Sequence, residues 1–232
     1  MNQFVNFLIF LAFGLCGYLI GSINNAVIIS NVFFRKDVRN YGSKNAGGTN
    51  TGRVFGRKAG VAVMVLDVLK SIFVYWAITL IFLFTNAGAY VDHPATIHFA
   101  MILTALGHCY PVYYKFKGGK AVSVVAGFIL ATNWLFTILG IVIFFSILKL
   151  RKMVSYASIL MAAVIAGLSP ILFIPLIGEH SFYPLVVQDL LYYIPTLVAL
   201  CVLLILKHRT NIERLQKGTE STITWMDKKK RQ

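Results

Sequence analysis

Residues 42–53 read G-S-K-N-A-G-G-T-N-T-G-R and carry the groups that bind phosphate anions. They include four glycines, five small polar side chains and two cations, between two long apolar runs. Glycine permits positive φ and close backbone approach, so successive N–H groups can converge on an anion while hydroxyls, amides and an arginine add donors. We interpret the stretch as a phosphate-binding loop, with a flexible interhelical linker as the alternative; no G-K-[ST] closes it, so it is not a Walker loop. The candidate residues are Gly42, Ser43, Asn45, Gly47, Thr49, Asn50 and Arg53.

Two further polar clusters lie at residues 107–120 and 207–220. In the cluster at 107–120, Gly118, Gly119 and Lys120 open a predicted helix, where free N–H groups and the helix dipole favour an anion. His108 in the same cluster is either a satisfied structural group or a candidate base. The other cluster offers His208 and Asn211, although taken alone it is an ordinary basic segment beside a membrane helix.

Two apolar runs also contain polar side chains at membrane depth. Asp67 and Lys70 stand three residues apart and therefore share one helix face. They form either a structural ion pair or a substrate contact, because ionisable groups in a membrane helix face the protein interior or a wet cavity. Ser22 follows Gly17 and Gly21, whose G-x-x-x-G spacing favours close helix packing. Ser22 itself lines either a polar cavity or a tight helix contact.

The composition excludes a soluble protein. Of 232 residues, 58% are hydrophobic and 13% are charged, and the mean hydropathy is +0.74, whereas soluble domains are about 45–50% apolar. We therefore predict an all-α, polytopic integral membrane bundle in a single domain, 1–232, because about 20 apolar residues span a bilayer. The three cysteines have no paired spacing, which argues against a disulfide framework or a zinc site.

We predict about seven transmembrane helices, at 3–34, 58–85, 95–113, 120–132, 134–149, 153–177 and 187–206. The fourth and fifth are short and meet near Asn133, so one long kinked segment is the alternative. With seven spans and the N-terminus outside, nearly all the cations behind the net charge of +14 lie in cytoplasmic loops, as the positive-inside rule requires. The C-terminus is then cytoplasmic, and all three polar clusters share that face.

Three basic, glycine-bearing clusters on one side of a hydrophobic bundle predict a site that receives anions from the cytoplasm and an apolar tail from the membrane. This combination points to chemistry on a lipid precursor. A transporter of a small phosphorylated anion and a non-catalytic lipid-binding scaffold are the competing interpretations. Against transport, the chain shows no obvious halves and its clusters do not gather at the midplane.

Three blocks of this sequence resemble the bacterial membrane glycerol-3-phosphate acyltransferases that use acyl phosphate as donor. The first comprises G-S-I from Gly21, residues 37–53 and D-V-L-K from Asp67. The second comprises G-H-C-Y-P from Gly107 with F-K-G-G-K from Phe116, and the third is residues 208–220. The family usually has glycine where this chain has Lys44, Ser71 and Ala121, proline at Asn24 and Ala46, and alanine at Gly48.

The resemblance implies a seven-span plasma-membrane enzyme with its active site facing the cytoplasm. Its reaction transfers the acyl group of acyl phosphate to the 1-hydroxyl of sn-glycerol 3-phosphate, giving lysophosphatidic acid. It implies no metal, no cofactor, no nucleic acid and no obligate protein partner; the partners are the two substrates and membrane lipid. We expect Ser43, Arg53, His208 and Asn211 to be catalytic and the other candidates to bind substrate. The base is His208, His108 or a phosphate oxygen of the donor, and the lack of a Ser-His-Asp arrangement argues against an acyl-enzyme.

Overall fold

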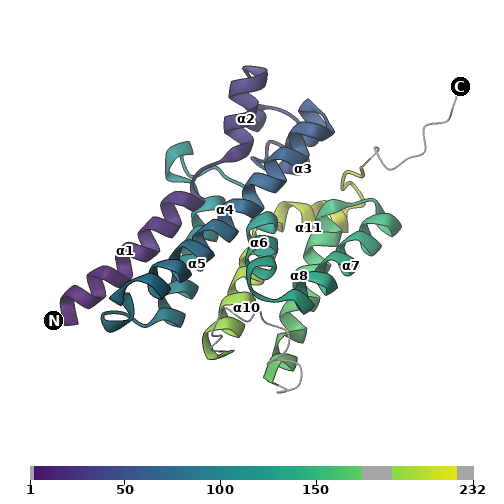
Figure 1. Ribbon diagram of the computed structural model, residues 1–232. Coiled ribbons are helices and arrows are strands. Elements are labelled where there is room, and N and C mark those ends of the chain that lie inside the picture. The colour runs from purple at the N-terminus through teal and green to yellow at the C-terminus, as the bar shows by residue number, and fades with distance from the viewer. Residues whose placement is uncertain (1–2, 174–189, 224–232) are drawn as a thin grey trace, which may run out of the picture.

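The computed structural model describes residues 3–173 and 190–223, and all the regular structure in these ranges is helical apart from an isolated bridge at Asn133. This agrees with the all-α prediction (Figure 1). Short 3-10 helices at Val38–Asn40, Asn86–Ala89, Val112–Tyr114 and Ser169–Phe173 lie in the connections. The α-helices are α1 (Gln3–Gly21), α2 (Asn25–Phe34), α3 (Gly48–Phe55), α4 (Arg57–Phe84), α5 (His93–Cys109), α6 (Val122–Thr132), α7 (Trp134–Arg151), α8 (Val154–Leu168), α10 (Leu190–Lys207) and α11 (Arg209–Gln216).

Within residues 3–173 and 190–223, six helical stretches are long and apolar enough to cross a membrane. They are Gln3–Phe34, Arg57–Phe84, His93–Tyr114, Trp134–Arg151, Val154–Phe173 and Leu190–Lys207. The predicted fourth span corresponds to α6, which has 11 residues. At 1.5 Å per residue α6 is only about 16 Å long, roughly half the hydrocarbon thickness. The end of the predicted span 153–177 and the start of 187–206 lie outside the described residues.

The predicted first span, 3–34, is two helices rather than one. The helix stops after Gly21 and restarts at Asn25, because the Asn24 side chain accepts a hydrogen bond from Val27 N (3.1 Å) and caps α2. Capping of this kind stabilises a new helix start and competes with a continuous helix. The interruption leaves the carbonyl groups of Gly21 and Ile23 free for the side chain of Lys70.

Helix α1 packs closely on α5 through small residues. Its only buried residues are Gly14, Gly17 and Gly21, and a Cβ at Gly21 would lie 2.8 Å from both Cα and C of Thr104. On α5, a Cβ at Gly107 would likewise collide with the backbone at the end of α1. The predicted packing role of the G-x-x-x-G spacing is confirmed, since close backbone approach is what such small residues permit.

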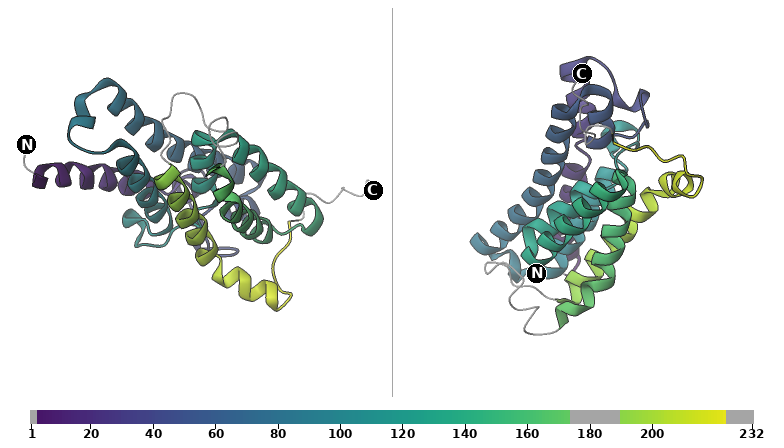
Figure 2. Two further views of the ribbon diagram at one scale, coloured as in Figure 1. Left: turned by 90° about the horizontal axis from the view of Figure 1, so that it is seen from below. Right: turned by 90° about the vertical axis from the view of Figure 1, so that its right-hand side faces the viewer.

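Helices α6 and α7 are separate, which agrees with the two-segment prediction. Asn133 lies between them with an extended backbone, and its side chain accepts a hydrogen bond from Phe136 N (2.9 Å), capping α7. The chain therefore bends at Asn133 rather than continuing as one helix. Further along, α11 turns away from the direction of α10 (Figure 2).

The first polar cluster folds into a short turn followed by helix α3. Gly48 and Gly52 of α3 face Gly60 of α4, and a Cβ at Gly60 would lie 2.7 Å from Gly48 O and 2.6 Å from Gly52 Cα. These glycines serve close helix packing, so the loop's glycines are not all available for an anion nest. Within the cluster only Gly42 (φ 57°) and Lys44 (φ 59°) have positive φ.

Candidate active-site cleft

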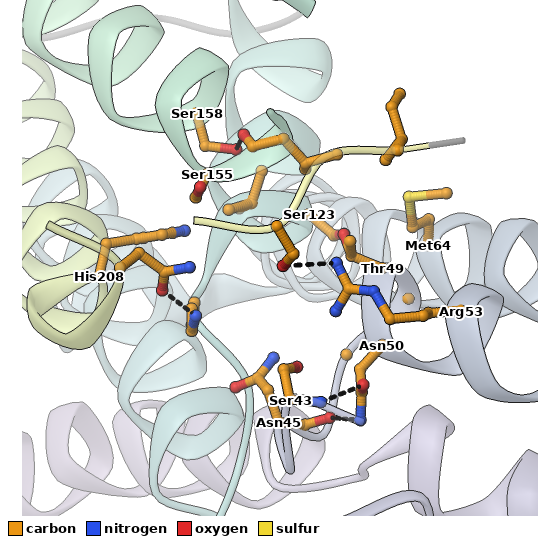
Figure 3. A pocket seen from close by; sticks show the side chains of 18 of the residues that line it. Ser43, Asn45, Thr49, Asn50, Arg53, Met64, Ser123, Ser155, Ser158 and His208 are labelled. Carbon is orange, nitrogen blue, oxygen red and sulfur yellow. Dashed lines mark hydrogen bonds between the residues drawn. The ribbon is translucent and has the colours of Figure 1, made fainter. Parts of the chain in front are cut away.

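The three polar clusters meet in one cleft with a cavity volume of about 120 Å³. Its walls come from the turn before α3, from α4 and α6, from the N-terminal turns of α8, and from α11 with the segment after it (Figure 3). The predicted residues that line it are Ser43, Asn45, Gly47, Thr49, Asn50, Arg53, Asp67, His108, Lys120, His208 and Asn211. The apolar lining is Met64, Val122, Phe144, Val154 and Ile223.

Asn50 holds the first turn together. Its Nδ2 lies within hydrogen-bond distance of Val38 O (3.1 Å), Tyr41 O (3.0 Å) and Asn45 O (3.1 Å), and its Oδ1 accepts from Ser43 N (2.8 Å). Because the amide is committed to the turn and the residue is 1% exposed, Asn50 shapes the wall of the cleft. Its neighbours Ser43 and Thr49 are exposed and carry hydroxyl groups on that wall (Figure 3).

Arg53 reaches from α3 to the segment that follows α11. Its Nη2 donates a hydrogen bond to Ser221 Oγ (3.1 Å), 168 residues away in sequence. That segment continues to the junction of α7 and α8, where Ile223 N donates to Lys152 O (2.8 Å) and the Ile223 side chain packs with Leu148 and Ala157. Residues 218–223 therefore form one rim of the cleft, opposite the first turn.

Lys120, Asn211 and Glu220 form a connected polar network. Lys120 Nζ donates to Asn211 Oδ1, and Asn211 Nδ2 donates to Glu220 Oε1 (2.8 Å). Glu220 also accepts from Ser155 Oγ (2.8 Å) and from Arg214 Nε (2.8 Å). Burial opposes its ionisation, but these hydrogen bonds outweigh burial and lower the pKa of Glu220.

Two cleft groups, Lys120 and His208, have lowered pKa values, which favours the uncharged form of each side chain. Burial, followed by the positive charge of Arg214, lowers the pKa of Lys120 to about 8. Burial also lowers the pKa of His208 to about 4, with Lys120 contributing in the same direction and the hydrogen bond to Leu204 opposing it. His208 is therefore neutral at pH 7, whereas Lys120 is still largely protonated.

The hydrogen bond made by His208 fixes its tautomer. Nδ1 lies 2.8 Å from Leu204 O, and a carbonyl oxygen can only accept, so Nδ1 carries the proton. The ring is 3% exposed and points into the cleft (Figure 3). Its Nε2 is consequently a hydrogen-bond acceptor in the resting protein.

Five predicted site residues do not line the cleft. Gly42 supports the first turn, and Gly118 and Gly119 support the turn before Lys120, where Gly119 N donates to His108 O (3.0 Å). Ser22 is fully buried and its hydroxyl accepts from Val112 N (3.4 Å). Lys70 lies beneath the cleft in an ion pair with Asp67 (2.9 Å).

Sequence reasoning missed several lining residues. Ser155 and Ser158 lie on α8 and Ser123 lies on α6, and both helices are otherwise largely apolar. The i, i+3 spacing of Ser155 and Ser158 was the available signal, since it places both on one face. Arg214, Glu220 and Ser221 also line the cleft; Glu220 belonged to the third block, but only its contacts reveal that it anchors Asn211.

The fold and the cleft together define a multi-pass helical membrane protein with a polar cleft that arginine, lysine and histidine side chains line. A family model described as glycerol-3-phosphate acyltransferase matches residues 11–218. The chain belongs to this family.

Relatives and solved structures agree with this assignment. The chain is 40% identical over 208 residues to the glycerol-3-phosphate acyltransferase of Streptococcus sanguinis, covering 90% of this chain and 89% of the relative. It is 38% identical over 215 residues to that of Staphylococcus haemolyticus, covering 90% and 95%. The crystal structure of PlsY (YgiH), an integral membrane glycerol 3-phosphate acyltransferase in its glycerol 3-phosphate form, superimposes with a TM-score of 0.73 at 28% identity, covering 92% of this chain and 95% of that chain.

Proposed function

We propose that this chain transfers an acyl group from acyl phosphate to the 1-hydroxyl of sn-glycerol 3-phosphate, releasing lysophosphatidic acid and phosphate. The observation that carries the proposal is the convergence of the three polar clusters on one cleft that also has an apolar wall. Matching structures of PlsY in glycerol 3-phosphate and lysophosphatidic acid forms support the substrate and the product.

The two substrates bring two phosphate groups, so the cleft needs two sets of donors. Ser43, Thr49 and Arg53 supply hydroxyls and a guanidinium on one wall, and Lys120 with Asn211 supplies an ammonium and an amide on the other. Arginine and lysine form charge-assisted hydrogen bonds with phosphate oxygens, which are the stronger kind. Holding both anions side by side aligns the hydroxyl with the acyl carbon and removes most of the entropic cost of their encounter.

The reaction needs one proton transfer. The hydroxyl oxygen forms a bond with the carbonyl carbon, the bond from that carbon to the phosphate oxygen breaks, and the hydroxyl proton must leave. His208 Nε2 accepts a hydrogen bond from the hydroxyl and orients it. With a pKa of about 4, His208 is a weaker proton acceptor than the phosphate oxygen that gains the electron pair of the broken bond. We therefore assign the final position of the proton to the departing phosphate.

The apolar wall is suited to the acyl chain. Met64, Phe144 and Val154 line the cleft next to its polar groups, so a chain entering from the hydrocarbon region would remain in apolar surroundings. We place the cleft on the cytoplasmic side of the bacterial plasma membrane, because the cations of the chain concentrate around it. A Lys44→Cys variant in inverted and right-side-out vesicles, labelled with a membrane-impermeant maleimide, tests this orientation.

The deciding assay uses purified full-length protein in lipid, acyl phosphate and labelled glycerol 3-phosphate. Formation of lysophosphatidic acid supports the proposal, and its absence in folded protein contradicts it. Counterflow of the same label in sealed vesicles, without product, would identify a transporter instead. Heat-denatured protein serves as the control for product formed without the site.

A further inference from the structure

A buried polar cluster lies directly beneath the cleft and is not used by the reaction proposed above. It consists of Asp67 and Lys70 of α4, His108 of α5 and Asn25 of α2. Asp67 Oδ1 accepts from Lys70 Nζ (2.9 Å) and from Asn25 Nδ2 (2.9 Å). Asp67, Lys70 and His108 are 2%, 8% and 5% exposed, so their mutual contacts fix their positions.

Lys70 determines the hydrogen-bonding state of His108. Its Nζ lies 3.0 Å from His108 Nδ1 and within hydrogen-bond distance of Gly21 O (3.1 Å), Ile23 O (2.8 Å) and Asp67 Oδ1 (2.9 Å), so its three N–H groups are shared among four acceptors. An ammonium group has donors only, and the Asp67 carboxylate beside it provides the opposite charge. His108 Nδ1 must therefore be the acceptor, which places the ring proton on Nε2.

Two observations place the Nε2 side of His108 toward the cleft. His108 is a lining residue, and in the described part of the chain its hydrogen bonds involve only Nδ1 and the main chain. A Cβ at Gly119 would collide with Nε2 and lie 2.8 Å from Cε1, so the imidazole edge sits against the turn that presents Lys120. Glycine at 119 keeps that edge uncovered.

We propose that His108 is an anion-binding residue of the cleft, acting as a neutral Nε2–H donor to a phosphate oxygen, and that Lys70 is the positioning residue that holds it in this tautomer. The identification of the anion as a substrate phosphate rests on the proposed function. It also removes His108 from the candidates for the base, because the nitrogen facing the cleft already carries a proton. His108 and His208 thus present opposite tautomers to one cleft, the first a donor and the second an acceptor.

Charged side chains of α4 and α10 lie around His108. Lys70 and Asp67 face it from α4, and Lys207 of α10 donates to the neighbouring Cys109 O (3.5 Å). Asp67 Oδ1 is 3.8 Å from His108 Nδ1, beyond hydrogen-bond distance. Removal of the Lys70 ammonium would leave Asp67 as the nearest charged partner, and Asp67 would then accept from Nδ1–H.

The first test measures the tautomer directly. The full-length protein, labelled with 15N-histidine and held in lipid nanodiscs without substrate, gives side-chain nitrogen shifts that separate Nδ1–H, Nε2–H and cationic rings. His108→Gln identifies the signal among the five histidines. We expect Nε2–H at pH 7 in the unmodified protein and Nδ1–H in folded Lys70→Met. An Nδ1–H or cationic ring in the unmodified protein would overturn the proposal, and an unchanged tautomer in Lys70→Met would remove the role of Lys70.

The second test asks whether Nε2–H binds the anion, with inorganic phosphate as the probe in calorimetry on the same nanodiscs. Glutamine can place an amide N–H near the Nε2 position, whereas the shorter asparagine reaches only the Nδ1 position. We expect His108→Asn to weaken phosphate binding about tenfold or more, since hydrogen bonds to charged groups are the stronger ones, and His108→Gln to weaken it less. Equal losses, or no loss, would contradict the proposal, as would an unmodified protein that binds no phosphate.

These measurements separate the inference from the proposed activity. The tautomer is read in the resting protein and the phosphate affinity is read without acyl donor, so neither requires turnover. A protein that has the expected tautomer and binds phosphate but forms no lysophosphatidic acid would retain the inference and lose the proposed function.

Discussion

Lys120 at the start of α6 donates a hydrogen bond to Asn211 of α11, across 91 residues of sequence. This contact joins the second polar cluster to the third, and Glu220 extends it to α8 through Ser155. The ammonium of Lys120 is therefore held in one place before any substrate arrives. Fixed charges of this kind stabilise an anion without a reorganisation cost at the moment of binding.

The pKa of Lys120 predicts how phosphate binding depends on pH. Burial, and then the charge of Arg214, lowers this pKa to about 8, so the ammonium is present below pH 8 and is lost above it. We expect the affinity for glycerol 3-phosphate to fall about tenfold between pH 7 and pH 9, while the phosphate ester, with a second pKa of about 6, stays dianionic.

Lys120→Arg is the matched control, because arginine stays protonated throughout this range. Its affinity, measured by calorimetry, should show no decline between pH 7 and pH 9 even if it is weaker overall. A decline of the same size in Lys120→Arg would assign the titration to another group.

His208→Ala tests the acceptor that orients the hydroxyl. We expect kcat to fall about 10- to 100-fold, as for loss of one hydrogen bond to the reacting group, with little change in KM for glycerol 3-phosphate. Because the pKa of His208 is about 4, the protein should show no loss of kcat from this residue as pH falls from 8 to 5. A change confined to KM would assign His208 to substrate binding.

The positions of most helices could be predicted from the sequence, because an apolar run long enough to span a bilayer has few alternatives to a helix. The predicted 58–85 corresponds to Arg57–Phe84, and the predicted 134–149 to Trp134–Arg151. The break at Ser22–Asn24 could not be located this way. It depends on partners distant in sequence, namely Lys70, which bonds the exposed carbonyls, and Val112, whose N–H donates to Ser22.

The meeting of the three clusters was predictable, whereas the task of each residue within them was not. Residue types indicate which groups can bind an anion, but their hydrogen-bond partners come from the tertiary structure. Asn50 was predicted to bind substrate, and its amide is used to hold the first turn. Asp67 and Lys70 were left open between a structural pair and a substrate contact; Lys70 is enclosed in the pair, while Asp67 also reaches the cleft wall.

Ala121 has a left-handed backbone (φ 62°) directly after Lys120, at a position where the resemblance implies glycine. A residue with a Cβ pays about 1 kcal/mol or more for this conformation. Ala121 is also fully buried, and loss of its methyl group costs about 0.8 kcal/mol, so Ala121→Gly should leave the stability nearly unchanged. Ala126→Gly, in the interior of α6, should destabilise it by about 1 kcal/mol. Thermal unfolding in detergent compares the two, and equal effects of the same sign would contradict the strain at Ala121.

The contact between α1 and α5 predicts that Gly21→Ala destabilises the protein by about 1–3 kcal/mol, as overpacking does elsewhere. The new Cβ would lie 2.8 Å from Cα and C of Thr104, and a helix backbone cannot yield as a flexible side chain can. Gly167→Ala in α8 is the control, since nothing lies within 4 Å of its Cβ and alanine favours the helix by about 1 kcal/mol. The temperature of thermal unfolding should therefore fall for Gly21→Ala and rise for Gly167→Ala. Because Gly21 O also accepts from Lys70 (3.1 Å), Gly21→Ala should additionally shift the His108 nitrogen signals, whereas Gly167→Ala should leave them in place.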